Sequence, residues 1–211
     1  MTETQQGSGA VAVVAGSGSL VTSALAGRLQ QAGWTVAHDV GTARGEQPIA
    51  ALVYAPDLFS GDDEVHTGSV IDDLTSLVDR ALPRMRSREG GGAKIVVVTS
   101  RDGLGWPNRP RTAATSAALV AFARSLALQL GPRGITVNVV ASLPVEGSAL
   151  HGADGPAGSH LREPQPLLPQ PVTAEDIAHT TAFFLDDRSG YITGQVLYCC
   201  GGASLLSSLS V

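Results

Sequence analysis

Residues 94–141 read KIVVVTS RDGLGWPNRPR TAATSAALVAFARSLALQLGPRG ITVNVVA, and this stretch decides the fold. The β-branched run at 94–100 is typical of a buried strand. A helix is predicted at 112–130, and Gly131 with Pro132 ends it. Its apolar face carries Leu119, Phe122, Leu126 and Leu130. A second strand at 135–141 completes a strand–helix–strand crossover, so the two strands should be parallel.

The start of this helix is where an enzyme of such architecture would keep its proton-transfer groups. The polar side chains available there are Thr112, Thr115 and Ser116. An unperturbed Ser or Thr hydroxyl is a poor proton donor near neutral pH. The stretch therefore predicts a well-defined fold with a weak catalytic complement.

Length and composition indicate one globular α/β domain at 10–211, preceded by a flexible tail at 1–9. The chain has 211 residues, of which 43% are hydrophobic and 16% charged, and its net charge is −5. This acidic balance argues against nucleic acid or an anionic membrane as a partner. No apolar run approaches ~20 residues, and the N-terminus lacks a signal-peptide pattern. We expect a cytoplasmic protein without a transmembrane helix.

Two adjacent cysteines, Cys199 and Cys200, are the whole cysteine content. Neighbouring cysteines rarely pair, because the disulfide would be strained. The chain has no CxxC motif and no His pair at ligand spacing, so we expect no metal site. The two side chains are interpreted as small apolar residues at a strand end, with a reactive thiol as the alternative.

The N-terminal part has a dinucleotide-binding layout: a buried strand at 10–16, a Gly/Ser turn, a helix and a second strand. Gly16 and Ser17 lie in the turn, and Asp39 follows Gly16 by 23 residues. Asp39 either accepts a hydrogen bond from a ribose hydroxyl or is an ordinary polar strand end. The helix start offers a positive dipole end to an anion. However, Leu20 should crowd a pyrophosphate, so we expect no cofactor, with weak NAD(P) binding as the alternative.

The next apolar strand, at 49–56, follows after only a short polar loop at 41–48. A doubly wound sheet usually uses ~30 residues or more for each βα unit. We therefore predict a Rossmann-like, doubly wound parallel sheet that lacks about one βα unit after its second strand.

Three later segments complete the chain. A helix is predicted at 69–88, and the last strand lies within YITGQVLYCCGG at 191–202. Between them, 142–171 is a Pro- and Gly-rich insertion of the length that usually covers a site or moves. His151 and His160 lie in it and are interpreted as surface residues, with acid–base catalysis as the alternative.

Taken together, residues 10–205 resemble a short-chain dehydrogenase/reductase of the kind that includes ketoacyl carrier-protein reductases. The segments that carry the resemblance are KIVVVTS, SLALQLGPRGITVNVVA and AEDIAHTTAFFLDDRSGYITGQVLYCCGG. The resemblance implies a Rossmann-like fold, an NAD(P) cofactor and oligomers built through the two long helices and the last strand.

The same resemblance places the family's functional positions, and most are replaced. The catalytic Ser falls on Ser100, whereas the Tyr and Lys of YxxxK fall on Thr112 and Ser116. The cofactor loop TGxxxGxG falls on Ala15–Thr22, where Gly16 alone matches. The other altered positions are Tyr54, Ala55, Pro56 and Asp57 in place of NNAG, Val70 near the relay Asn, and Ser142-Leu143-Pro144 at the PG motif.

These replacements favour a non-catalytic subunit that assembles with an active homologous reductase, or with itself as a homodimer. Residues expected at the interface are Leu74, Leu77, Met85, Leu119, Phe122 and Leu126. One alternative is rebuilt non-redox chemistry, such as a cyclase, dehydratase or isomerase acting on an acyl or polyketide-like substrate. Its candidate groups are Ser100, Asp102, Asp57, His66 and His151. The other is a residual NAD(P)-dependent oxidoreductase that uses a water held by Ser100 and Thr112.

Overall fold

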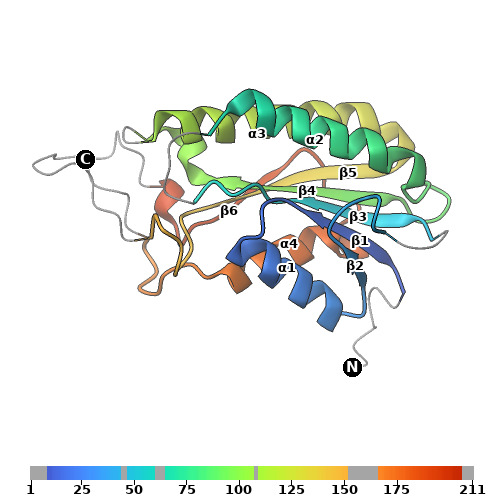
Figure 1. The fold of residues 1–211 in the computed structure, drawn as a ribbon, viewed down its shortest axis with the longest axis horizontal. Helices are drawn as coiled ribbons and strands as arrows, with labels where there is room; N and C mark the ends of the chain where they lie inside the picture. Colours follow the sequence, from blue (N-terminus) through green and yellow to red (C-terminus); the bar gives the residue numbers. More distant parts are fainter. Residues whose placement is uncertain (1–8, 44–46, 60–64, 107–108, 152–165, 206–211) are drawn as a thin grey trace, which may run out of the picture.

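A computed structural model describes residues 9–43, 47–59, 65–106, 109–151 and 166–205. It contains a parallel six-stranded sheet with helices on both faces (Figure 1). The elements are β1 Val11–Ala15, α1 Leu20–Gln31, β2 Thr35–Ala37, β3 Ile49–Tyr54, α2 Thr67–Ala81, β4 Ala93–Ser100, α3 Pro110–Leu130, β5 Ile135–Ser142, α4 Ala174–Leu185 and β6 Val196–Cys199. Short 3₁₀ helices are η1 Leu82–Arg84, η2 Arg101–Leu104, η3 Gly131–Arg133, η4 Asp187–Ser189 and η5 Ala203–Leu205.

The strand order β2-β1-β3-β4-β5-β6 confirms the shortened sheet. The usual Rossmann order, 3-2-1-4-5-6, has one more strand outside the second. Here β2 is the edge strand, and only Thr35–Ala37 pair with β1. The chain then returns from β2 to β3, which lies on the other side of β1, and the described residues of this connection form no helix, as the short polar loop predicted.

The predicted helix at 69–88 ends earlier in the structure. Helix α2 stops at Ala81, and η1 follows it. Pro83 lacks the backbone N–H that the next helical hydrogen bond would require, so the α-helical pattern ends in this turn. Residues 1–8, nearly half of the 142–171 insertion (152–165, including His160) and the tail at 206–211 lie outside the described residues.

Two apolar cores sandwich the sheet. One lies between the sheet and α2 with α3, and the other lies between the sheet and α1 with α4. The continuous apolar runs in β1, β3 and β4 follow from this arrangement, because both faces of these strands are buried.

The residues expected at an interface belong to the first of these cores, which corrects the expectation. Leu74, Leu77, Met85, Leu119 and Leu126 are buried within this chain, and Phe122 packs against the same core. The apolar face of an amphipathic helix is used first to cover its own sheet. An interface on α2 or α3 would therefore use the outward-facing residues of these helices.

Within the described residues, one helix, Pro110–Arg133, is long and apolar enough by composition to cross a membrane. The sequence alone predicted no such helix, because no apolar run of the required length is present. Its buried residues Leu119, Ala123 and Leu126 pack in the core beneath α3. A core helix passes the same test of length and composition, and packing on the sheet accounts for the buried part of this helix, 39% of its apolar window.

A buried lysine is tied to the C-terminal part of the chain. Lys94 Nζ lies 2.6 Å from Asp187 Oδ1, and Arg86 Nη2 lies 3.5 Å from the same oxygen. The Lys94 side chain is buried, whereas that of Asp187 is mostly exposed. The hydrogen bond from Lys94 is the main cause that holds the pKa of Asp187 below its usual value.

Asp187→Asn should therefore lower the free energy of unfolding at neutral pH. In acid, where Asp187 of the wild-type protein is also uncharged, the two proteins should have nearly the same stability. The folded-state pKa of Asp187 lies below the unfolded one, so its contribution is complete above about pH 4 and disappears as the pH falls further. After solvent screening we expect about 1 kcal/mol at pH 7. Urea unfolding between pH 2 and 7, with the exposed α2 variant Asp79→Asn as control, measures it. A difference independent of pH would contradict this assignment.

Candidate functional site

Three of the family's catalytic positions lie at the carboxyl end of β4 (Ser100) and in the first turns of α3 (Thr112 and Ser116), and all three side chains are buried. Ser100 is 2% exposed, and its Oγ accepts a hydrogen bond from the Asp102 N–H at 3.1 Å. Its hydroxyl thus caps η2. Thr112 and Ser116 are 2% and 0% exposed. The structure brings the three predicted residues to one place and closes that place to solvent.

Helix η2 forms the cover over Ser116. A Cβ added at Gly103 would lie 3.2 Å from the Ala117 nitrogen and 3.3 Å from Ser116 Cβ. This close approach leaves no space between the cover and α3 for the long side chain that a Lys at 116 would need. Beside it, the hydroxyls of Thr115 and Thr67 are 2.7 Å apart and join α3 to α2.

A buried ion pair holds the cover closed. Arg109 Nε donates to Asp102 Oδ2 at 2.8 Å, and Arg109 Nη2 donates to Asp102 Oδ1 at 3.3 Å. Both side chains are buried, and the guanidinium carbon lies 6.0 Å from the ring centre of the buried Trp106. At the other end, Arg101 reaches the Ala203 carbonyl at 3.5 Å. Sequence analysis singled out Asp102 but missed Arg109, because no local pattern pairs them.

An open cleft lies elsewhere, at the carboxyl ends of β1, β2 and β3. Its volume is about 660 Å³, and its lining includes Gly16, Ser17, Asp39, Asp57, His66 and Arg80. A second cleft of about 510 Å³ lies between α1 and α4. Neither cleft is lined by Ser100, Thr112 or Ser116.

Asp57 and His66 are the two non-redox candidates that share the first cleft. One oxygen of Asp57 accepts from the Phe59 N–H at 3.0 Å. Ser100 and Asp102 are buried outside the cleft, and His151 is an exposed turn residue that lines neither cleft. Tyr54 also faces the cleft, but its hydroxyl donates to the Val70 carbonyl, and burial raises its pKa to about 12.

Gly16, the retained glycine of the cofactor loop, has a structural role. Its φ is +145°, and a Cβ there would lie 2.0 Å from the Ala55 carbonyl oxygen. The ends of β1 and β3 approach so closely that only glycine fits. Retention of this glycine is therefore explained by the fold without a nucleotide.

The start of α1 satisfies its own backbone donors. Ser19 Oγ accepts from the Thr22 N–H at 3.3 Å, and Thr22 Oγ1 accepts from the Ser19 N–H at 2.8 Å. This capping box uses two of the N–H groups that a helix start would offer to an anion. Leu20 is 51% exposed and lines the second cleft, not the cleft of Gly16 and Ser17, so the expected crowding of a pyrophosphate by Leu20 is not seen. The capping box is what makes this turn a poor fit for the pyrophosphate of a dinucleotide.

No cluster of three or more His, Cys, Asp or Glu suited to a metal occurs among the described residues. Cys199 is half-buried at the end of β6, and burial raises the pKa of its thiol. Cys200 is buried, and its Sγ accepts from the Ser204 N–H at 3.3 Å. Both positions agree with the interpretation as small packed residues.

Comparisons with known proteins agree with this fold. A sequence model of the family described as Enoyl-(Acyl carrier protein) reductase matches residues 70–204. An oxidoreductase of the short-chain dehydrogenase/reductase family from Burkholderia thailandensis superposes with a TM-score of 0.71 at 22% identity, covering 92% of each chain. A dehydrogenase/reductase from Sinorhizobium meliloti gives 0.69 at 21% identity, covering 93% of this chain and 95% of that one.

Sequence relatives carry dehydrogenase and reductase names. Subunit BbsD of (2S)-[(R)-hydroxy(phenyl)methyl]succinyl-CoA dehydrogenase from Thauera aromatica is 38% identical over 121 residues, 56% of this chain and 48% of that protein. Subunit BbsC of the same organism is 34% identical over 124 residues, 59% of this chain and 48% of that protein. The 3-oxoacyl-[acyl-carrier-protein] reductase FabG of Escherichia coli is 36% identical over 132 residues, 61% and 51% respectively.

The doubly wound sheet and the matched region, which runs from α2 to η5, define a Rossmann-type oxidoreductase fold. The chain belongs to the short-chain dehydrogenase/reductase family. It spans about half the length of the curated relatives it matches.

Proposed function

We propose that this chain is a non-catalytic subunit that assembles with an active homologous reductase and supports it. The observation that carries the proposal is the burial of Ser100, Thr112 and Ser116 beneath the cover closed by Asp102 and Arg109. Hydride transfer to a carbonyl leaves an oxyanion that needs a proton donor in contact with it. Here the family's donor position is a Thr, and it is out of reach of a substrate.

The proposal includes independence from NAD(P). The capping box of Ser19 and Thr22 argues against a bound pyrophosphate, because it occupies two of the N–H groups at this helix start. The first cleft also carries the carboxylates of Asp39, Asp57 and Asp73 with Arg80 as the one cation among its described lining residues. Such a surface repels a polyanion.

Two lines of support favour a subunit. The names of BbsD and BbsC both denote subunits of one dehydrogenase, and both proteins are relatives of this chain. In addition, large apolar side chains are exposed on several elements of the fold, among them α3 and the region around β6. Leu128 on α3 is 82% exposed. On and beside the edge strand β6, the exposed residues are Phe183, Tyr191, Leu197 and Tyr198.

Co-expression with an intact homologue from the same genome, one that has the family's Tyr and Lys, tests the assembly. We expect the tagged chain to co-purify with it and to elute as one complex. The purified chain alone should oxidise neither NADPH nor NADH with ketoacyl substrates. A monodisperse chain that forms no complex, or one that turns over at the homologue's rate, would overturn the proposal.

Leu128→Glu places a charge on the outward face of α3, and we expect the recovered complex to fall at least about tenfold, since burying an unpaired carboxylate is costly. Leu20→Glu is the matched control, because Leu20 is also exposed but lies on α1, on the opposite face of the sheet. Equal loss in both variants would argue against an interface on α3.

A further inference from the structure

The chain crosses from β2 to β3 through residues 38–48, and the described parts of this segment, 38–43 and 47–48, contain no helix. The crossover passes on the face covered by α2, because Val40 and Ala43 are buried in the same core as Leu74. Ordinarily a βα unit would stand between these two strands and hold the connection to the sheet. The crossover must therefore be held to the sheet by contacts with other elements.

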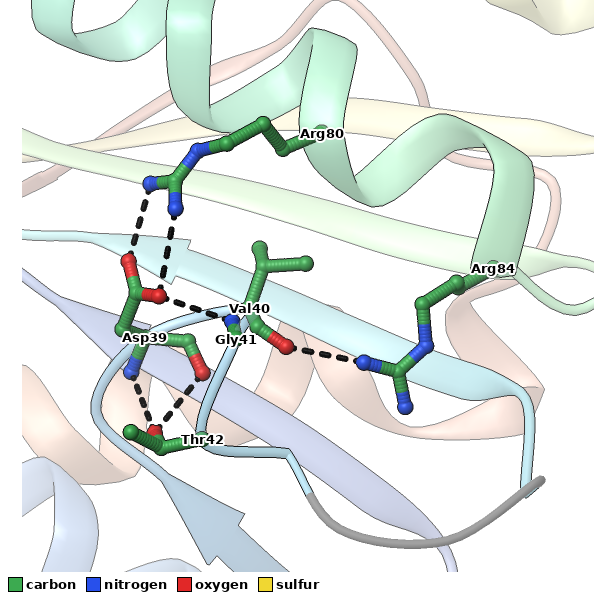
Figure 2. Close-up of polar contacts among 6 residues, drawn as sticks. All are labelled: Asp39, Val40, Gly41, Thr42, Arg80 and Arg84. Carbon is green, nitrogen blue, oxygen red and sulfur yellow. Dashed lines mark hydrogen bonds and ion pairs between the residues drawn. The ribbon is translucent and has the colours of Figure 1, made fainter.

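Arg84, in the turn after α2, binds the crossover backbone. Its Nη1 donates to the Val40 carbonyl at 2.8 Å, and its Nη2 donates to the Ala43 carbonyl at 2.9 Å. The guanidinium thus binds two carbonyls of one tight turn, and Figure 2 shows the bond to Val40. Peptide carbonyls that no strand or helix satisfies need such a partner.

Arg80, one helical turn earlier, binds the start of the same turn through its side chain. Its Nη1 and Nη2 donate to Asp39 Oδ1 at 3.1 Å and Oδ2 at 2.8 Å, the paired geometry typical of Arg with a carboxylate (Figure 2). Asp39 Oδ1 also accepts from the Gly41 N–H at 2.7 Å. Thr42 Oγ1 donates to the Asp39 carbonyl at 2.9 Å. The hydrogen bond from Arg80 is the main cause that lowers the pKa of Asp39.

We propose that Asp39, Arg80 and Arg84 form a crossover latch that replaces the missing βα unit, and that Asp39 is its anchor and not a ligand for a ribose. Asp39 and Arg80 both line the first cleft, so their ion pair lies in the cleft at the end of β2. A ribose hydroxyl there would have to share the carboxylate with the guanidinium, which already donates to both oxygens. This inference does not depend on the non-catalytic role proposed above.

Hydrogen–deuterium exchange of the segment 38–43, followed by mass spectrometry, tests the latch. Arg84→Ala removes two hydrogen bonds to buried backbone, so exchange in this segment should accelerate by about tenfold or more. Arg80→Ala removes a more exposed ion pair and should accelerate exchange in this segment by about two- to fivefold. Arg124→Ala, an exposed arginine on α3, is the control and should change nothing in the segment. Peptides from β4 serve as the internal reference for global unfolding.

A double-mutant cycle makes the assignment specific. Asp39→Asn combined with Arg80→Ala should accelerate exchange no more than Arg80→Ala alone, because the two side chains act as a pair. If Arg84→Ala destabilises the whole protein, the cycle of Asp39→Asn and Arg80→Ala, which removes only an exposed pair, still tests the latch. Additive effects, or unchanged exchange in both arginine variants, would overturn the latch.

Nucleotide addition tests the role of Asp39. Millimolar NADH or NADPH should leave the exchange of 38–43 in the wild-type protein unchanged. Slower exchange in this segment on addition of either nucleotide would assign Asp39 to a ribose and overturn the inference. That result would also contradict the independence from NAD(P) proposed above. The proposed loss of catalysis would survive it, because it rests on Ser100, Thr112 and Ser116, which do not line this cleft.

Discussion

Replacing Arg109 with alanine should lower the free energy of unfolding by about 3–5 kcal/mol, because Asp102 would remain buried without its cation. The Asp102 side chain is 3% exposed, so water cannot take over the lost hydrogen bonds without opening the cover. Urea or guanidinium unfolding with linear extrapolation measures the loss.

Two further variants separate this cause from a general loss of charge. Arg111→Ala, two residues later and exposed at the start of α3, should change stability by less than about 0.5 kcal/mol. Asp102→Leu combined with Arg109→Met removes both charges and should be less harmful than Arg109→Ala alone. A loss below about 1 kcal/mol in Arg109→Ala would mean that the cover is not held by this pair.

The expected outcome of opening the cover also bears on function. If the folded Arg109→Ala protein still shows no reductase activity, the chemistry is absent and not merely enclosed. Thr112 and Ser116 stand where a Tyr and a Lys would be needed, so we expect no activity even with the cover destabilised.

Gly16→Ala should also lower the free energy of unfolding strongly, by about 2–6 kcal/mol. Backbone strain at a positive φ costs about 1–3 kcal/mol. Crowding against packed backbone adds about 1–3 kcal/mol. The added Cβ would lie 2.0 Å from the Ala55 carbonyl oxygen, so β1 and β3 would have to separate. Thermal and denaturant unfolding both report the change.

Gly18→Ala in the same turn is the matched control. No heavy atom lies within 4 Å of a Cβ added at Gly18, and its φ is not in the left-handed region. We expect a change of less than about 0.5 kcal/mol, as for most surface substitutions. Similar losses in the two variants would show that the turn needs glycine for a reason other than the contact with Ala55.

Local patterns in the sequence were enough to predict the fold class. The apolar runs of β1, β3 and β4 indicated strands buried on both faces, and the helix at 112–130 was predicted within two residues of α3. The missing βα unit followed from length alone, since residues 41–48 are too few to form one. Such features depend on neighbours in the chain, which is why sequence reasoning reaches them.

The replacement of the family's catalytic residues was also visible in the sequence, because the YxxxK motif has a fixed spacing that Thr112 and Ser116 match. The burial of these side chains could not be predicted from the sequence. Whether Ser100 opens on a cleft or caps η2 depends on how the segment after β4 packs against α3.

The tertiary structure alone decided which groups meet. Asp39 pairs with Arg80, 41 residues later, and Asp102 in η2 pairs with Arg109 at the start of α3. No periodicity predicts either pair, because irregular loops have no repeat that would place one side chain against another. The helix leucines could equally have faced a partner or the chain's own sheet. The sequence determined that they form an apolar face, and packing determined that the sheet is what they cover.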